Sequence, residues 1–453
     1  MLALNRLAAA CAVSFPLLVP PAWAAVSAEE AARLKTTLTP LGAERAGNKD
    51  GSIPAWNGGL TTPLPSDKPD GRRGDPFKDE KPLYSITAKN ADQHAAKLTD
   101  GTLAMLRKYP ETYRVDVYKT HRTAAAPQWV YDNTAKNTVR ARMEGDLLVG
   151  AYAGVPFPIP QNGMEVMWNH MLRWRAPTYR AYLNQYVLTT DGKSVLTSSL
   201  TIDLQTPYFF QDGSPEQFAK SNDFWMTRLQ LNGPASRAGE GTVLRMNIDG
   251  DKTNTWLYVP GQRRVRKLPN VCCDTPNASS SGVLFSDEVE VWAGRLDQFD
   301  WKLEGRKEML VPYNVNKQFQ PESDKDLLMR NHLNPDHVRW ELHRVWVVEA
   351  TLRAGKRHQA PRGKYYCDED TWTCVLADRW DAKGQLWRTL YVHNFVAPDV
   401  PAVMVAGYGY YDLLSGAGYA GSLAASKPSQ YPIRPRIPDS FFTPDSLAAE
   451  GVR

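Results

Sequence analysis

The stretch LRMNIDGDKTNTWLYVPGQRRVRKL, residues 244–268, decides the fold because it has the pattern of a β-hairpin. Leu244, Met246 and Ile248 alternate with polar residues, as in a strand with one buried face. Residues 249–251 (DGD) reverse the chain, and residues 255–259 (TWLYV) return with apolar side chains on both faces. A strand that is apolar on both faces must be covered on both. We therefore interpret the hairpin as part of a surface that holds a ligand. The candidates to line its cavity are Leu244, Met246, Trp256 and Tyr258.

Four cations in five residues follow the hairpin's second strand: Arg263, Arg264, Arg266 and Lys267. Charges at this density fit badly in a buried core but well at the mouth of a cavity. They are candidates to bind an anionic head group, a membrane surface or an acidic partner. A strand edge kept soluble by charge is the simpler alternative.

Working outward, similar patterns predict a large antiparallel sheet. The predicted strands are 179–189, 194–204, 241–248, 255–259, 301–312, 337–352, 363–367, 372–380 and 385–395. Short turns such as residues 191–192 and 381–384 connect several of them, which is typical of an antiparallel meander. Over residues 345–348 both faces become apolar. One long, strongly curved sheet with a covered concave face explains that change.

One helix carries a soft apolar face. Met164, Met167, Trp168 and Met171 lie on one side of a helix that opens after Gly163. A methionine-rich face adapts to irregular partners, which fits a greasy ligand, while a core helix against a sheet is the commoner case. We count these four residues as further cavity candidates. We interpret His170, just off this face, as a hydrogen-bonded structural histidine.

Three other helices are predicted from their capping residues and composition. The capping box Ser27–Glu30 starts one over residues 28–38, and residues 90–107 form another that Gly101 can split. Ser214 followed by Pro215 predicts a third, which runs to about Leu231.

The N-terminus has the pattern of a secretory signal peptide, residues 1–24. Arg6 provides the positive charge, residues 7–19 the apolar segment and residues 22–24 (AWA) the cleavage site. Cys11 faintly suggests lipidation, but the apolar segment continues past it. The remaining chain divides into a helical and extended segment (25–110), a curved sheet domain (111–400) and a Gly/Tyr- and Pro-rich C-terminal tail (401–453). We expect the proline-rich part of that tail to be extended and largely non-regular.

The four remaining cysteines fall into two pairs. Cys367 and Cys374 flank an acidic turn with a spacing that two paired strands can bridge, which favours a disulfide in an oxidising compartment. Cys272 and Cys273 are adjacent, so a strained vicinal disulfide, two reduced thiols and bridges elsewhere all stay open. Neither pair has the spacing of a metal site with a second ligand pair.

The sequence contains none of the common catalytic signatures, such as G-x-S-x-G, the phosphate-binding G-x-x-x-x-G-K-S/T or H-E-x-x-H. We therefore predict no catalytic residues and no cofactor. The net charge of +5 over 453 residues is mild and gives no support for nucleic acid as a partner.

Two groups of side chains carry atoms that can ligate a metal ion. His332, His337 and His343 are near one another in the sequence, but strand side chains alternate between faces, so we predict no shared metal site. Residues 368–370 (DED) could ligate calcium or supply a carboxylate pair. A solvated acidic turn is the simpler interpretation.

Several segments together resemble a proteobacterial family of unknown function, DUF1329, whose members are often labelled outer-membrane lipoprotein-sorting proteins. These segments are 38–48 (LTPLGAERAGN), 53–59 (IPAWNGG), 155–160 (VPFPIP), 168–170 (WNH), 256–260 (WLYVP), 346–350 (WVVEA) and 368–372 (DEDTW). The resemblance covers nearly all of the mature chain, and the first and third segments are quite specific.

The resemblance implies an α+β fold like that of the periplasmic lipoprotein carriers LolA and LolB. That fold is a large curved antiparallel sheet, a half-open β-barrel, with helices packed on the concave face and a hydrophobic cavity. It also implies a periplasmic location, free or associated with the outer membrane, and a role near exporters of the resistance-nodulation-division type. No catalytic residues come with the family.

We therefore predict a periplasmic binding or carrier protein for a lipid-like or hydrophobic molecule that is not an enzyme. The alternatives are a non-catalytic envelope adaptor that docks an inner-membrane exporter or an outer-membrane protein, and an envelope hydrolase.

Overall fold

The structure is a computed structural model that describes residues 26–68, 70–268, 272–427 and 429–450. The predicted signal peptide, with Cys11, lies outside these residues. No helix in the described part of the chain combines the length and the hydrophobicity that a bilayer span requires.

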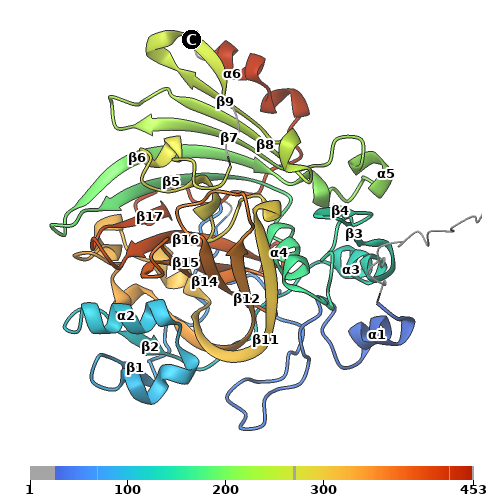
Figure 1. Cartoon of the computed structure of the whole chain (residues 1–453), viewed down its shortest axis with the longest axis vertical. Helices are drawn as coiled ribbons and strands as arrows, with labels where there is room; N and C mark the ends of the chain where they lie inside the picture. The colour runs from blue at the N-terminus through green and yellow to red at the C-terminus, as the bar shows by residue number, and fades with distance from the viewer. Residues whose placement is uncertain (1–25, 69, 269–271, 428, 451–453) are drawn as a thin grey trace, which may run out of the picture.

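A single fifteen-stranded sheet contains two antiparallel meanders and two further short strands (Figure 1). The first meander contains β5 (Thr178–Leu188), β6 (Ser194–Gln205), β7 (Asp223–Gly233), β8 (Gly241–Asn247), β9 (Asn254–Val259) and β10 (Arg264–Leu268). The second contains β11 (Phe299–Pro312), β12 (Trp340–Leu352), β13 (Arg362–Asp368), β14 (Cys374–Trp380), β15 (Leu386–Ala397), β16 (Ala402–Asp412) and β17 (Gly418–Leu423). Strand β17 pairs with β5 and so joins the second meander to the first.

The sheet is curved and open. Its strand order runs from β1 (Tyr84–Ile86) and β2 (Val115–Val117) through β12 to β17, and then from β5 to β10. Strand β11 pairs with β12 beside this path, and β10 does not pair back to β1 among the described residues. The α+β class and the half-open, curved antiparallel sheet predicted from the sequence are confirmed.

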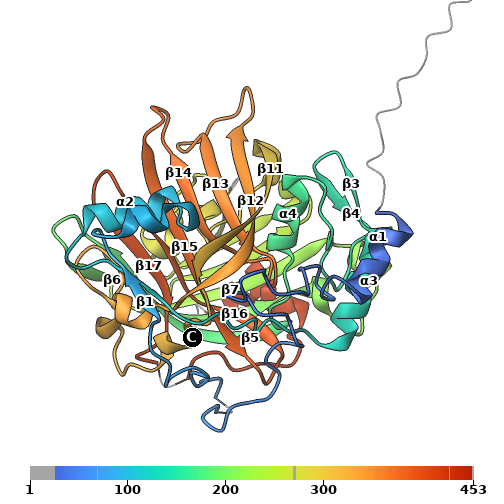
Figure 2. The same ribbon diagram turned by 90° about the horizontal axis from the view of Figure 1, so that it is seen from below.

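Helices pack on both faces of the sheet, which Figure 2 shows from below. On the concave side α4 (Gly163–Met171) packs against β11 and β12, with α3 (Gln128–Arg140) and the small hairpin of β3 (Arg142–Glu144) and β4 (Leu147–Val149) beyond it. On the other face η2 (Ala91–Lys97) and α2 (Asp100–Lys108) cover the second meander, where α2 packs against β14 and β15. The helix predicted over 90–107 is therefore divided at Leu98 and Thr99, not at Gly101.

The two faces of the second meander have separate hydrophobic cores because side chains alternate along each strand. Leu390 and Val392 of β15 belong to the large core that contains α4. Tyr391, between them, belongs to the core that contains Met105 and Leu106 of α2. Because each face of these strands packs against a core of its own, residues such as 345–348 are apolar on both faces.

The helix predicted from Ser214 to Leu231 is mostly wrong. Ser214 does cap a helix, but α5 is only Pro215–Phe218, and Asn222 then takes a left-handed conformation with φ of 58°. The chain continues as β7, whose aromatic and β-branched residues pack well in a sheet. Ser214 caps a helix as its sequence predicts, but sheet packing decides the structure after that helix.

The sheet also continues past the boundary predicted at residue 400. Strands β16 and β17, with the Gly/Tyr-rich sequence, lie in the interior of the sheet between β15 and β5. Glycine fits there because the chains approach closely: a Cβ at Gly409 would stand 1.9 Å from the carbonyl oxygen of Tyr419. After β17 the chain leads to η12 (Asp439–Phe442) and α6 (Pro444–Glu450), which lie against β8 to β10 (Figure 1).

Candidate ligand-binding cavity

A cavity of about 810 Å³ lies on the concave face of β7, β8 and β9. Helix α4 and the loop from Cys272 to Asp297 form its other walls. Most of the large side chains that line it are apolar: Trp168, Met171, Phe224, Trp225, Leu229, Leu244, Met246, Ile248, Leu257, Leu268, Val289 and Leu296. Apolar walls with few polar groups are typical of sites for hydrophobic ligands.

Alternation along the hairpin explains which of its residues reach the cavity. Leu244 pairs with Thr255 and Thr242 with Leu257, and all four side chains line the cavity. Trp256 and Tyr258 have the opposite parity, so they do not line it. They contact a small core on the convex face with Phe442 and Leu447. Of the four hairpin candidates, Leu244 and Met246 face the cavity and the two aromatic residues face away.

Of the four candidate residues in α4, two line the cavity and two do not. Trp168 and Met171 line the cavity, whereas Met164 and Met167 do not. Met164 packs against the large core, and Met167 places its sulfur 3.9 Å from Cys374 Sγ. The methionine face therefore serves both the core and the cavity.

The four candidate cations are all exposed, and none of them pairs with another described residue. In the register of β9 and β10, Arg266 stands opposite Leu257, and Arg264 opposite Val259. Cross-strand partners share a face, so Arg264 and Arg266 lie on the concave face beside the cavity wall. Lys267 stands opposite Trp256 on the convex face, and Arg263 lies in the turn before β10.

The charged side chains that line the cavity are joined in ion pairs. Arg295 donates to Asp297 at 2.9 and 2.7 Å and also pairs with Asp251. Its guanidinium holds the pKa of Asp297 below its ordinary value. Asp146, at the tip of the β3–β4 hairpin, is bound at 2.6 and 2.8 Å by Arg353. These pairs fix the β3–β4 hairpin and the turn after β8 at the edge of the cavity.

Cys272 and Cys273 are both free thiols, and Cys272 lines the cavity. The hydrogen bond between them lowers the pKa of Cys272 and raises that of Cys273. Of the three alternatives left open by the sequence, the structure has the reduced pair.

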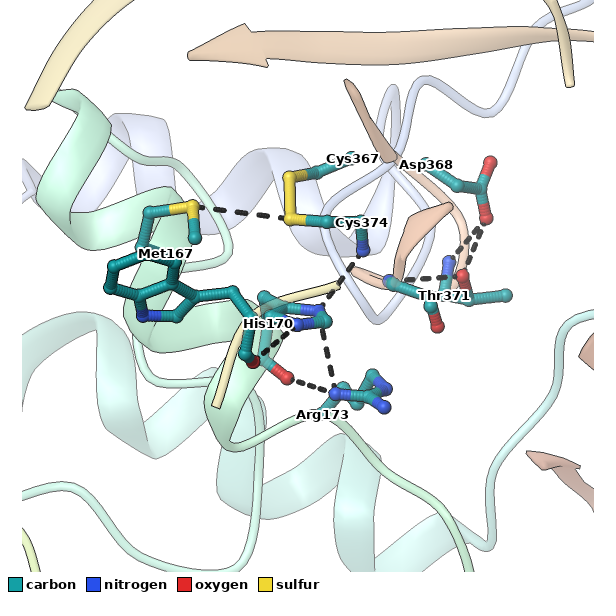
Figure 3. Close-up of a disulfide and its surroundings, with 9 residues drawn as sticks. Met167, His170, Arg173, Cys367, Asp368, Thr371 and Cys374 are labelled. Carbon is teal, nitrogen blue, oxygen red and sulfur yellow. Dashed lines mark hydrogen bonds between the residues drawn. A yellow bond between two sulfur atoms is a disulfide. The ribbon is translucent and has the colours of Figure 1, made fainter. Parts of the chain in front are cut away.

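The predicted disulfide between Cys367 and Cys374 is present and lies under α4 (Figure 3). His170 of α4 accepts a hydrogen bond from the Cys374 N–H at 3.0 Å, and its Nε2 bonds the Trp292 carbonyl at 3.0 Å. Burial, with Arg173 and Arg175 nearby, lowers the pKa of His170 well below its ordinary value. The interpretation of His170 as a structural histidine is confirmed.

The interpretation of residues 368–370 as a solvated acidic turn is wrong. Asp368, Glu369 and Asp370 are 0%, 2% and 3% exposed. The turn is folded inward, and the indole of Trp372 donates to the Leu41 carbonyl at 2.8 Å. Arg122 and Arg344, with Arg306, supply the charges that make this burial tolerable. Sequence reasoning missed the burial because these arginines are distant in the chain.

The fold and the cavity together define the class of protein: an open, curved antiparallel sheet whose concave face holds an apolar cavity. The chain belongs to the family described as "Protein of unknown function (DUF1329)", whose sequence profile matches residues 85–448. It is 39% identical to the uncharacterized protein PA3922 of Pseudomonas aeruginosa in an alignment of 450 residues that covers 97% of this chain and 97% of that protein.

Solved structures with a similar fold include a DUF1329 family protein from Desulfovibrio piger. It is 15% identical, with a TM-score of 0.40 over 60% of this chain and 92% of that one. A domain named for outer-membrane lipoprotein sorting, from Vibrio parahaemolyticus, is 11% identical. Its TM-score is 0.44 over 63% of this chain and 98% of the domain.

Proposed function

We propose that the protein is a periplasmic binding or carrier protein for a lipid-like or otherwise hydrophobic molecule. The observation that carries the proposal is the apolar cavity of about 810 Å³ between the sheet and α4. Transfer of each methylene group from water into such a site contributes about 0.8 kcal/mol. An acyl chain of ordinary length therefore binds without any catalytic group, even after the cost of immobilising it.

The rim suggests the rest of the ligand. Arg264 and Arg266 share the concave face with Leu257 and carry no ion pair to a described residue. An anionic head group on a chain that occupies the cavity would have these guanidinium groups within reach. The proposed ligand is thus an amphiphile with an apolar tail and an acidic head.

Native mass spectrometry of gently isolated protein tests the proposal. We expect a bound mass in the lipid range that Leu244→Asp abolishes, because a carboxylate in the cavity wall loses its hydration against an apolar chain. Leu196→Asp is the matched control, since Leu196 is 37% exposed on β6 and does not line the cavity. The proposal is contradicted if the protein purified from its native host carries no bound lipid and also takes up no added fatty acid or phospholipid.

The exposed cations also favour a second candidate, an envelope adaptor. In that case the protein is isolated empty but with a membrane partner, such as an exporter of the resistance-nodulation-division type. Replacing Arg263, Arg264, Arg266 and Lys267 by Gln would release that partner without changing the cavity. A hydrolase, in contrast, would turn over ester or glycoside substrates.

A further inference from the structure

A second group of side chains lies apart from the cavity, between β12 and the buried turn after β13. His343, Asp368 and Asp370 place one ligand atom each within 4.8 Å of one another, and all three are buried. His343 comes from β12, Asp368 ends β13, and Asp370 lies in the turn that the disulfide closes. This grouping is not evident from the sequence, because the pairing of β12 with β13 brings residues together that are 25 positions or more apart in the chain.

Glu341 determines which ring nitrogen of His343 carries the proton. Its Nε2 lies 3.0 Å from Glu341 Oε2, so the ring donates there and presents the lone pair of Nδ1 on its other side. A histidine whose one nitrogen donates to a carboxylate is the usual outer-shell arrangement of metal-binding imidazoles. Tyr313 stacks on this ring at a centroid distance of 3.7 Å and holds its plane.

Asp368 directs a free oxygen toward that lone pair. Its Oδ2 accepts hydrogen bonds from the Thr371 N–H at 2.9 Å and the Thr371 hydroxyl at 2.7 Å (Figure 3). Its Oδ1 is buried, has no hydrogen-bond partner in the described structure and stands 3.9 Å from His343 Nδ1. That distance is too long for a hydrogen bond, but two ligands on one metal ion stand roughly 3 to 4 Å apart.

Another buried polar atom beside these groups has no partner. The Tyr313 hydroxyl belongs to a residue that is 1% exposed and makes no hydrogen bond in the described structure. Unpaired buried oxygens are costly unless something outside the protein chain satisfies them.

The charges of the surrounding network do not balance. Six carboxylates face four guanidinium groups, so two negative charges remain when all of these groups are ionised and both histidines, His343 and the His121 that pairs with Glu80, are neutral. The carboxylates are Glu44, Glu80, Glu341, Asp368, Glu369 and Asp370, and the arginines are Arg122, Arg306, Arg339 and Arg344. Protons or one divalent cation could remove the excess.

We propose that His343 Nδ1, Asp368 Oδ1 and one carboxylate oxygen of Asp370 bind a divalent transition-metal ion, such as Zn²⁺ or Mn²⁺. The mixed nitrogen and oxygen donors favour these ions over Mg²⁺ and Ca²⁺, which prefer oxygen alone. Arg122 bonds both oxygens of Asp370, at 2.8 and 2.7 Å, but each oxygen keeps a second lone pair for the ion. The proposed role of the site is structural. The bound ion would fix the turn that leads into Cys374 of β14, and the N–H of Cys374 donates to His170 of α4.

The test uses the whole chain, purified without a histidine tag, treated with a chelator and then exchanged into ZnCl₂, MnCl₂, MgCl₂ or CaCl₂. We expect one Zn²⁺ or Mn²⁺ per chain by elemental mass spectrometry after gel filtration, and a higher melting temperature with these two ions only. His343→Asn and Asp368→Asn should each weaken binding at least tenfold. The matched controls are His393→Asn and Asp378→Asn, because both side chains are equally buried but belong to other contacts of the sheet.

Pulsed paramagnetic resonance of Mn²⁺ bound to the wild-type chain provides a readout that needs no variant. Coupling of the ion to a histidine nitrogen supports the proposed site. This measurement stays informative if the variants fail to fold, because it uses only the wild-type chain. The proposal is overturned if the wild-type chain retains no ion, if the bound Mn²⁺ shows no nitrogen coupling, or if folded His343→Asn and Asp368→Asn chains bind as well as the controls. Retention of no ion would mean that protons alone balance the network.

Discussion

At the scale of the residue, a buried carboxylate makes the stability of the fold depend on pH. Asp378 of β14 is fully buried and accepts a hydrogen bond from the Gly101 N–H of α2 at 2.9 Å. Burial raises its pKa to about 6. The fold therefore favours the protonated acid, and its stabilising contribution is present in full only at low pH.

We expect Asp378→Asn to stabilise the protein at neutral pH. The pKa of Asp378 is 3.8 in the unfolded chain and about 6 in the folded one. As pH rises through this range, the free energy of unfolding of the wild type falls by on the order of 3 kcal/mol. The variant does not lose this free energy, because its amide side chain does not ionise. Thermal denaturation at pH 4 and pH 7.5 checks this: the two proteins should melt together at the lower pH and a few degrees apart at the higher. A variant that melts at or below the wild type at pH 7.5 would count against it.

At the scale of the element, the C-terminal η12 and α6 act as a cover for the convex face of β8 to β10. Phe442 and Leu447 contact Met226, Val243 and Tyr258 there. A Cβ at Gly241 would stand 2.6 Å from Leu447 Cδ1, so the helix lies close to the strand. The cavity wall is thus held from behind by the end of the chain.

We expect Phe442→Ala to loosen the cavity wall. Truncation of a fully buried phenylalanine costs roughly 3 to 5 kcal/mol, since the space it leaves fills only partly. Hydrogen exchange should quicken in β8, β9 and β10 before the second meander is affected. The control is Phe441→Ala, because Phe441 is only half-buried and stacks on Arg228. Equal exchange in both variants would show that the cover does not support the wall.

At the scale of the whole molecule, the two meanders share one sheet and one core. The pairing of β17 with β5 joins them, and Leu183 and Leu204 of the first meander lie in the same core as Leu390 and Val392 of the second. A division between them would expose two strand edges and a large apolar surface.

We therefore expect the chain to unfold as one unit. Far-ultraviolet circular dichroism and tryptophan fluorescence should report the same transition, and calorimetry should show a single peak. Two separate peaks, or a stable fragment of residues 26–268 on its own, would show that the meanders are independent.

The sequence by itself determined the features that depend on local pattern. Alternation predicted most strands, the spacing of Cys367 and Cys374 predicted their disulfide, and the apolar stripe of residues 164–171 predicted α4. It also predicted that the hairpin carries cavity residues, of which Leu244 and Met246 line the cavity. Each of these depends on residues that are close along the chain.

Only the tertiary structure decided the rest. Alternation separates two faces of a strand but does not say which is concave, so Leu257 and not Trp256 lines the cavity. Sheet pairing placed residues 223–233 in β7 despite the helix cap before them. The burial of residues 368–370 depends on Arg122, Arg306 and Arg344, and the grouping with His343 depends on strand pairing. Such partners are set by long-range packing, which a local pattern cannot specify.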